Sequence, residues 1–274
     1  MNILYCGDEK TKDGLLISIL SLLKNVKEEL NIYIMTMELE YDGKVYHPVS
    51  DSTVAFLDKT VKKGNNKNFV KKTDVTDLFH DEIPLANMQT RFTPYCMLRL
   101  YADRIEEYPD KILYLDNDVI CRKDCSEFYN QNMDDCEIAG VLDYYGRLFF
   151  RRNIFKMDYI NSGVLLLNMK KIREEGLFLK CRKMCREKKM FMPDQSAINK
   201  LSVSKRIHPR RYNEQRKLHT DTVMQHFTTG FRFFPWLHTL TVKPWQVEKV
   251  HSKLKLYEYD DILENYESMK TQLL

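Results

Sequence analysis

The stretch Lys111–Ile120, KILYLDNDVI, places the tightest constraint on how this chain can fold. A short apolar, β-favouring run stops abruptly at Asp116, and a second carboxylate, Asp118, follows one residue later. Buried parallel strands end in this way at the C-terminal edge of an α/β sheet, where ligands collect. Two carboxylates in such a loop can both reach a divalent cation, Mn²⁺ or Mg²⁺, that also binds a substrate diphosphate. The stretch therefore predicts a metal site at the edge of an α/β sheet.

Length and composition are consistent with that fold class. The chain has 274 residues, of which 43% are hydrophobic and 30% are charged. This permits one large α/β domain, or a domain with a smaller appendage. No apolar run approaches the roughly 18 residues of a membrane span, and residues 1–5 read as an immediate strand rather than a signal segment. We therefore expect a cytoplasmic protein.

Neither the cysteines nor the net charge points to a special class of partner. Cys121 and Cys125, like Cys181 and Cys185, have four-residue rather than CxxC spacing, which favours reduced packing cysteines over a metal site. The formal charge of +4 is modest, so no nucleic acid partner is expected.

Two local segments are more basic than the chain as a whole. Residues 200–217 carry seven Lys and Arg against the single acidic Glu214, and residues 170–189 read as a basic helix. A solvated face is the simplest interpretation. The alternative is attraction to an anionic acceptor or peripheral contact with anionic lipid on the inner face of the membrane.

The chain opens as a β-α unit, with a strand at residues 2–6 and an amphipathic helix from about 11 to 30. Asp8 follows that strand, where a carboxylate can accept hydrogen bonds from a nucleobase or ribose, although a turn or helix cap is the alternative. The Rossmann Gly-x-Gly-x-x-Gly is missing, since only Gly7 and Gly14 occur here, and this argues against NAD.

A second strand is expected at 31–37, irregular polar segments at 41–51 and 62–72, and a helix at 93–108 that leads into the central strand. Arg99 on that helix would bring a cation close to a diphosphate site, although a surface arginine is an equally good interpretation.

Further predicted elements follow the metal motif. They are a short helix within 121–130, a strand at 137–143 that ends in Asp143, a strand at 159–168, a helix that opens at 193–199 and a tail helix from about 260. Asp143 would end a strand parallel to the metal strand, so its side chain would point to the same rim.

In chain order, six elements together resemble the pattern of glycosyltransferase family 8, that of bacterial lipooligosaccharide galactosyltransferases and glycogenin. They are ILYCGD, YLDND, VLD, YINSGVLLLN, PDQ, and HFTTG with KPW. The resemblance implies a GT-A fold, a Rossmann-like α/β domain whose mixed, mainly parallel sheet is flanked by helices, with a small C-terminal helical extension. Residues 1–250 would form one domain, with a nucleotide-binding half at 1–120 and a donor-sugar and acceptor half at 121–250, and residues 251–274 a helical tail.

The same resemblance implies roles for individual residues. The metal would be held by Asp116, Asp118 and His226. The nucleotide-sugar would be bound by Cys6, Gly7, Asp8, Arg99, Asn117, Asn161, Gly230 and Lys243. The catalytic side chains would be Gln195, Asp194 and Asp143.

The implied activity is retaining transfer of a hexose, glucose or galactose, from a UDP-sugar to a saccharide or lipid-linked glycan. It would depend on Mn²⁺ or Mg²⁺ and serve bacterial-type surface polysaccharide or lipooligosaccharide synthesis. Retention requires either a nucleophile behind C1 or attack by the acceptor from the leaving-group face. The residue near that back face would be Gln195, a poor nucleophile, so we favour front-face attack over double displacement.

One departure from the family pattern leaves two candidates for the diphosphate contact. His226 and Lys243 are seventeen residues apart, and the segment between them supplies a second cation, Arg232. We favour Lys243 because Pro244 fixes the backbone beside it. The aromatic residues within 231–236 would then form a flap over the acceptor entrance or pack against the body.

Three other classes of protein share parts of this pattern. Asp116-Asn117-Asp118-Val119 also fits the nucleophile motif of haloacid dehalogenase-like phosphatases, but that motif normally follows the first strand. A nucleotidyltransferase would need a Gly-rich phosphate loop, which CGDEKTKDG is not. A sugar-binding module without catalytic activity is the third alternative. All three predicted metal ligands are present in this chain, which favours an enzyme.

Overall fold

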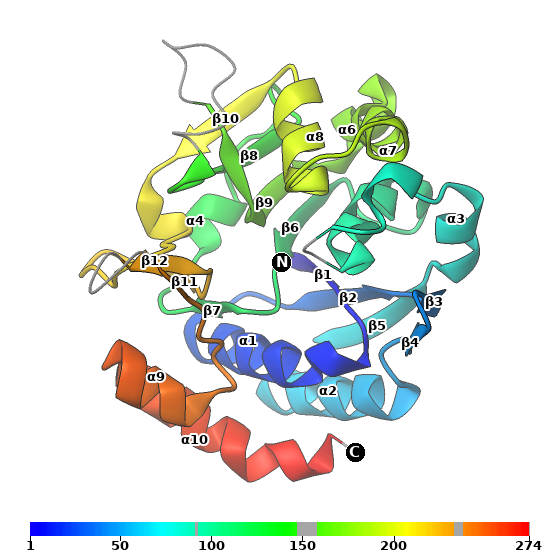
Figure 1. Ribbon diagram of the computed structural model, residues 1–274. Helices are drawn as coiled ribbons and strands as arrows, with labels where there is room; N and C mark the ends of the chain where they lie inside the picture. The colour runs from blue at the N-terminus through cyan, green and yellow to red at the C-terminus, as the bar shows by residue number, and fades with distance from the viewer. Residues whose placement is uncertain (91–92, 147–157, 233–237, 274) are drawn as a thin grey trace.

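A computed structural model describes residues 1–90, 93–146, 158–232 and 238–273. Its centre is a seven-stranded sheet in the order β10-β8-β9-β6-β1-β2-β5 (Figure 1). The strands are β1 (Asn2–Cys6), β2 (Asn31–Thr36), β5 (Phe69–Asp74), β6 (Lys111–Leu115), β8 (Ile138–Leu142), β9 (Ile160–Asn168) and β10 (Lys205–His208). Neighbouring strands are parallel except at β9, which is antiparallel to both β6 and β8. The prediction of a mixed, mainly parallel sheet is confirmed.

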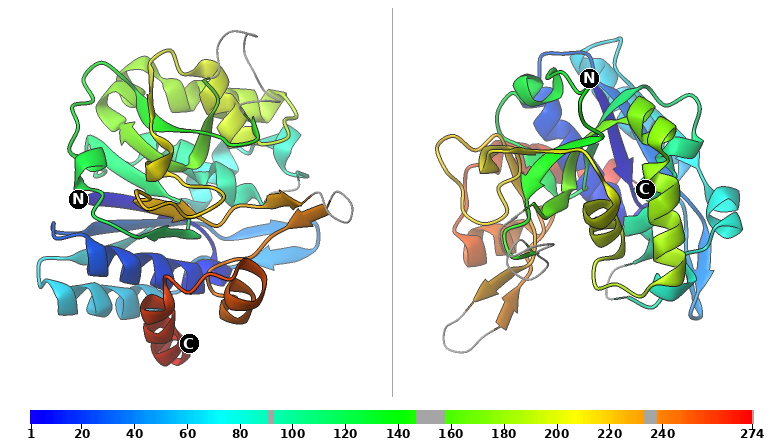
Figure 2. Two further views of the ribbon diagram at one scale, coloured as in Figure 1. Left: turned by 90° about the vertical axis from the view of Figure 1, so that its left-hand side faces the viewer. Right: turned by 90° about the horizontal axis from the view of Figure 1, so that it is seen from above.

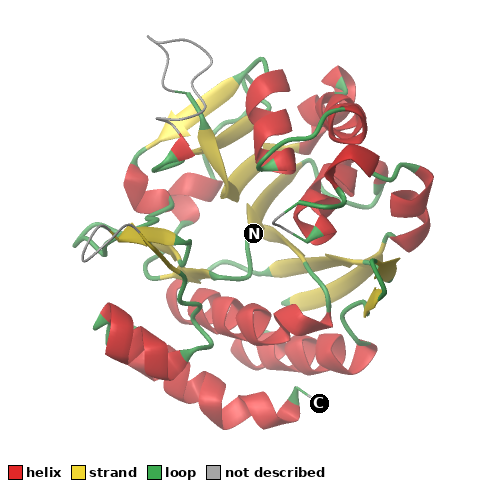
Figure 3. Ribbon diagram, viewed as in Figure 1, coloured by secondary structure: helices red, strands yellow, loops and turns green. Residues whose placement is uncertain are grey.

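Helices cover both faces of the sheet (Figures 1 and 3). One face carries α1 (Lys12–Asn25) and α2 (Asp51–Gly64), with α10 (Asp260–Met269) packed outside α1 and preceded by α9 (Val247–Leu254). The other face carries α3 (Thr76–Asp81), the 3₁₀ helix η3 (Pro94–Arg104), α6 (Met169–Glu175), α7 (Leu177–Glu187) and α8 (Pro193–Leu201). Alternate side chains of a strand point to opposite faces, so Ile3 and Tyr5 join the first core and Leu4 and Cys6 the second.

Smaller elements lie around the sheet (Figure 2). Three antiparallel pairs are β3 (Leu39–Tyr41) with β4 (Lys44–Tyr46), β7 (Val119–Cys121) with β11 (Met224–His226), and β12 (Gly230–Arg232) with β13 (His238–Leu240). The short helices are α4 (Ser126–Tyr129), η1 (Glu9–Thr11), η2 (Leu85–Asn87), η4 (Arg210–Tyr212) and η5 (Lys270–Gln272). In the described part of the chain, every helix is too short or too polar to cross a lipid bilayer.

Several predicted elements are corrected by the structure. Residues 62–72 are not one irregular loop, because α2 continues to Gly64 and β5 begins at Phe69, where pairing with β2 satisfies the backbone despite polar side chains. The single helix predicted at 170–189 is two helices, because Gly176 adopts a left-handed φ of 65° between them. The helix predicted at 93–108 is a 3₁₀ helix that ends at Arg104, and the first helix ends at Asn25.

The tail helix predicted from about residue 260 is confirmed as α10, whereas α9 lacks a counterpart in the prediction. The division into a domain at 1–250 and a tail at 251–274 stays a prediction.

Candidate active site

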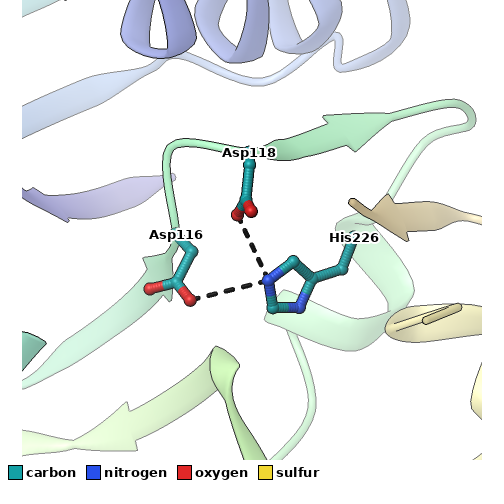
Figure 4. A group of neighbouring side chains, drawn as sticks. All are labelled: Asp116, Asp118 and His226. Carbon is teal, nitrogen blue, oxygen red and sulfur yellow. Dashed lines mark ion pairs between the residues drawn. The ribbon is translucent and has the colours of Figure 1, made fainter. Parts of the chain in front are cut away.

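Asp116, Asp118 and His226 converge at the C-terminal edge of the sheet (Figure 4). Asp116 directly follows β6, and after a tight turn the chain forms β7, whose pairing with β11 sets His226 opposite Val119. Nε2 of His226 lies 3.6 Å from Oδ2 of Asp116 and 3.2 Å from Oδ1 of Asp118. One ligand atom from each residue lies within 4.8 Å of the others. The geometry suits a single cation bound between two carboxylates and an imidazole.

Gly163 makes room for this arrangement. It lies on β9, and its carbonyl oxygen accepts a hydrogen bond of 2.8 Å from the backbone N–H of Asp116. A Cβ atom at this position would lie 2.1 Å from Cε1 of His226 and 2.7 Å from Oδ2 of Asp116. Any side chain here would therefore collide with two of the three predicted ligands.

Asp116 is oriented by two donors on its other oxygen. Oδ1 accepts hydrogen bonds from the Tyr114 hydroxyl at 2.7 Å and from Nη2 of Arg99 at 2.9 Å, which leaves Oδ2 facing His226. The Arg99 guanidinium is buried, stacks 4.0 Å above the Tyr114 ring and pairs through Nε with Asp194 at 3.3 Å. Burial raises the pKa of Asp194, and Arg99 offsets part of that shift. Arg99 thus links two carboxylates at the base of the site.

Asp118 is held by a different cation. Its Oδ2 forms an ion pair with Nζ of Lys243, which also donates to the carbonyl oxygen of Phe227 at 3.1 Å. Burial alone would raise the pKa of Asp118, but Lys243 and His226 outweigh it and bring the pKa well below its usual range. Asp118 is therefore ionised at neutral pH, and an ammonium group lies next to the predicted metal position.

Behind Lys243, three distant parts of the chain meet at Gly14 in α1. A Cβ atom on Gly14 would lie 2.5 Å from the carbonyl oxygen of Asn117 and 2.8 Å from the Trp245 ring. The corner that carries Lys243 is thus anchored against the first helix and the turn between the two carboxylates.

The predicted catalytic side chains form a hydrogen-bonded group beside the metal site. Oδ2 of Asp143 accepts from Nε2 of Gln195 at 3.1 Å and from Nδ2 of Asn161 at 2.9 Å. Oε1 of Gln195 accepts from the backbone N–H of Ser162 at 2.9 Å, and the Ser162 hydroxyl donates to Asp194 at 3.1 Å. Because β9 runs antiparallel between β8 and β6, its first residues lie at the edge where those two strands end.

These groups line one pocket of about 610 Å³, within the size range of small-molecule sites. Its described lining residues are Cys96, Arg99, Asp116, Asp118, Asp143, Tyr145, Gly146, Asn161, Ser162, Phe191, Met192, Asp194, Gln195, Gln215, His226, Thr228, Thr229 and Lys243. A larger hollow of about 710 Å³ opens at the opposite end of β6 and β9, where Lys111 and Asn168 lie, and the described residues around it include none of the predicted site residues. The smaller pocket is therefore the candidate active site.

Residues 2–248 match the family model described as Glycosyl transferase family 8. The chain belongs to glycosyl transferase family 8.

Named relatives of this family 8 chain include bacterial sugar transferases. A putative glycosyltransferase of Haemophilus influenzae is 25% identical over 66% of this chain and 52% of that protein. Lipopolysaccharide 1,2-glucosyltransferase of Escherichia coli K12 is 23% identical over 94% of this chain and 76% of that protein. The chain spans about half the length of the Haemophilus relative, and only 14% and 16% of two streptococcal glycosyltransferases that it also matches.

Solved structures show the same fold. An active-site mutant of LgtC aligns with a TM-score of 0.71 at 18% identity, covering 98% of this chain and 96% of that chain. The galactosyltransferase LgtC in complex with donor and acceptor sugar analogs aligns with a TM-score of 0.67 at 17% identity, covering 99% and 100%. The prediction of a GT-A fold is confirmed.

The phosphatase alternative is not supported. The Asp-Asn-Asp-Val segment follows β6, after five earlier strands, rather than the first strand of the chain. The family match across residues 2–248 also leaves little of the chain outside the glycosyltransferase pattern.

Other predicted donor-binding residues lie outside the described lining of the pocket. Cys6 ends β1 at the same sheet edge, and Gly7 and Asp8 follow it, Asp8 being buried and bridged to Pro48. Burial raises the pKa of Asp8, against the opposing charge of Lys10. Asn117 lies in the turn between the two carboxylates, and Gly230 begins β12. Their roles stay predictions.

Residues 233–237, the centre of the predicted aromatic flap, lie outside the described residues, and Arg232 is described only as the last residue of β12.

Sequence reasoning missed several residues in and next to the pocket. Ser162 lines it and Gly163 lies against two of the predicted metal ligands, and the only sequence signal for them was a pair of small residues directly after Asn161. Asn213 and Gln215 lie in the basic segment, and local sequence gives no sign that the chain brings them to His226 and to the backbone on either side of Asp143.

Proposed function

We propose that this chain transfers glucose or galactose from a UDP-sugar to a saccharide or lipid-linked glycan, with retention of anomeric configuration and dependence on Mn²⁺ or Mg²⁺. One observation carries the proposal. Oxygen atoms of Asp116 and Asp118 and the Nε2 atom of His226 face one another in a pocket that is also lined by the predicted catalytic residues Asp143, Asp194 and Gln195.

The donor set fits a divalent ion. Carboxylate oxygens with one imidazole nitrogen suit Mn²⁺, and the side chains that hold Asp116 leave its Oδ2 directed at the site. A bound divalent ion would offset the negative charge that develops on the departing diphosphate.

Lys243 supplies a second positive charge in the same place. Its ammonium group lies beside Asp118 and can donate to a diphosphate oxygen without moving to another part of the pocket. Asn161 and Gln195 are neutral amides, which would bind sugar hydroxyls without competing for the cation. Cys6, Gly7 and Asp8 would hold the uridine at the adjacent end of β1.

The hydrogen bonds favour front-face attack by the acceptor. Gln195 has both ends of its amide bound, Asp143 accepts several hydrogen bonds, and Asp194 is buried against Arg99. A nucleophile that forms a covalent intermediate would have to give up such contacts first. The acceptor proton would instead pass to the leaving phosphate oxygen.

Release of UDP from UDP-glucose or UDP-galactose with Mn²⁺ tests the activity directly. We expect EDTA and Asp118→Ala each to abolish it, because removing a ligand of a metal and diphosphate site costs several kcal/mol of transition-state stabilisation. Activity that survives both changes would refute the metal site. NMR of the first-formed glycoside should show an α linkage from an α-linked donor, and a β coupling would refute retention.

Comparison of two variants distinguishes the candidates for the diphosphate contact. Lys243→Ala should lose about 1.5 to 3 kcal/mol, chiefly in kcat and UDP affinity, because a charge-assisted contact to the leaving group is lost. Arg232→Ala should mainly alter the KM of the acceptor. The reverse pattern would assign the diphosphate to Arg232.

Contact with anionic lipid would involve α7 more than residues 200–217. In that segment three arginines form ion pairs within the protein: Arg206 with Asp135, Arg210 with Glu214, and Arg211 with Glu127. Lys180, Lys183 and Arg186 are exposed on α7. Replacing these three with Ala should reduce salt-sensitive sedimentation with anionic vesicles, whereas Lys62→Ala with Lys63→Ala on α2 should not. Equal binding of the wild-type protein to neutral and anionic vesicles at low salt would count against membrane contact.

A further inference from the structure

Four buried polar side chains form a continuous hydrogen-bonded chain from the end of β8 to the metal site. Nδ2 of Asn161 donates to Oδ2 of Asp143 at 2.9 Å, and Nδ2 of Asn213 donates to Oδ1 of Asn161 at 3.0 Å. Oδ1 of Asn213 then lies 3.3 Å from Nδ1 of His226. Their exposed fractions are 8% for Asp143 and Asn161, 0% for Asn213 and 6% for His226, so bulk water does not substitute for these partners.

The donor and acceptor of each hydrogen bond in this chain follow from the Asp143 carboxylate at one end. An ionised carboxylate only accepts hydrogen bonds, so Asn161 must present its NH₂ group to Asp143 and its oxygen to the other side. That oxygen also accepts the backbone N–H of Gly163 at 3.0 Å, which confirms the orientation. Asn213 must therefore present its NH₂ group to Asn161 and its oxygen to His226.

The last link determines where the proton of the neutral imidazole lies. An amide oxygen can only accept, so Nδ1 of His226 must carry a hydrogen. The Nε2 atom then has a free lone pair, and it faces Oδ2 of Asp116 and Oδ1 of Asp118. In this tautomer three acceptor atoms are directed at one point, and a divalent cation between them would take the place that a proton on Nε2 otherwise fills.

We propose that Asn213 is a positioning residue that fixes His226 as the Nδ1–H tautomer and so makes Nε2 a metal ligand. The inference rests on the proposed function in one respect, because it takes the three acceptors to be a divalent metal site. Asp143 is the origin of the orientation, so the donor-sugar side of the pocket and the metal ligand are parts of one network.

The test is Mn²⁺ affinity, measured by electron paramagnetic resonance of the free ion without nucleotide or acceptor. Asn213→Ala should weaken Mn²⁺ binding about 10- to 100-fold, the range found for partners that orient a metal-bound histidine. Asn213→Asp keeps an acceptor for the Nδ1 proton and should recover most of that loss. Asn87→Ala is the matched control, because Asn87 is equally buried and bonded but lies against the end of α7, and its Mn²⁺ affinity should equal that of the wild type.

An isosteric change at the far end gives a second test that does not depend on Asn213 variants folding. Asp143→Asn removes the acceptor-only end and leaves only the backbone N–H of Gly163 to hold the orientation of Asn161, so Mn²⁺ binding should weaken although Asp143 is not among the three ligands. Wild-type affinity in both Asn213→Ala and Asp143→Asn would overturn the inference, as would equal weakness of Asn213→Asp and Asn213→Ala. Absence of Mn²⁺ binding by the wild type would overturn it as well.

Failure of the proposed function has a different signature. If the wild type binds Mn²⁺ and the variants behave as expected but no UDP is released from either donor, the positioning role holds and the activity is wrong. If UDP is released and Asn213→Ala binds Mn²⁺ normally, only the positioning role is wrong.

Discussion

Gly163→Ala should greatly weaken metal binding while leaving the fold intact. The new methyl group would lie 2.1 Å from Cε1 of His226, so the imidazole must retreat by at least about 1.3 Å to reach the 3.4 Å of ordinary van der Waals contact. Metal–ligand distances tolerate only about 0.2 Å. The same methyl group would also lie 2.7 Å from Oδ2 of Asp116, so two of the three ligands are displaced together.

We expect Mn²⁺ binding to weaken about 100-fold or more, which corresponds to about 2.7 kcal/mol. Gly163 does not have a positive φ, so alanine fits the backbone of β9 and the loss belongs to the site. Gly140→Ala on β8 is the control, because its Cβ would meet the flexible ends of Leu165 and Ile160 at 3.1 and 3.4 Å. It should change the unfolding free energy but not the Mn²⁺ affinity.

Paramagnetic resonance of free Mn²⁺ and UDP release under single-turnover conditions measure the two effects, with circular dichroism to establish folding. A folded Gly163→Ala protein that binds Mn²⁺ within about threefold of the wild type would refute the reasoning.

Three further predictions concern the groups beneath the metal site. Arg99→Ala should lower the free energy of unfolding by about 3 to 5 kcal/mol in urea titrations, because Asp116 and Asp194 lose their buried partner; a loss under about 1 kcal/mol would contradict this. Tyr114→Phe removes one donor to Asp116 and should cost about 1 kcal/mol of stability with up to about 10-fold weaker Mn²⁺ binding; unchanged values for both would show that the hydroxyl is dispensable. Cys96 lines the pocket, but burial raises the pKa of its thiol far above the usual value, so mass spectrometry should show slow alkylation at pH 8 until the protein unfolds; rapid labelling would contradict this.

The sheet and its functional edge could be predicted because they follow from local patterns. The apolar run before Asp116 and the position of Asp143 at a strand end each indicate a buried strand that stops at the same rim. The strand β5 could not be found in this way, since its polar sequence is stabilised by pairing with β2 rather than by its own side chains. The prediction of a loop at residues 62–64 was wrong for a related reason. The exposed lysines at the end of α2 give this part of the helix the polar composition of a loop.

Local sequence patterns could not predict how the metal ligands come together. Asp118 and His226 are brought together by the pairing of β7 with β11, and only the family resemblance connected them beforehand. Gly163 and Asn213 were missed because their importance lies in what surrounds them in space. A glycine in a strand signals a close approach, but sequence does not say which side chain approaches.

The contact at Gly14 has a consequence for how the protein folds. Trp245 and the turn around Asn117 meet on the first helix, so the site joins segments from the beginning, middle and end of residues 1–245. Contacts between residues this far apart in sequence form late, because the entropy of closing such long loops opposes them until the sheet is in place. During synthesis the carboxylates leave the ribosome long before His226 and Lys243. We therefore expect the cation site to be among the last features to form, so that Mn²⁺ binding during refolding would follow the meeting of all three segments.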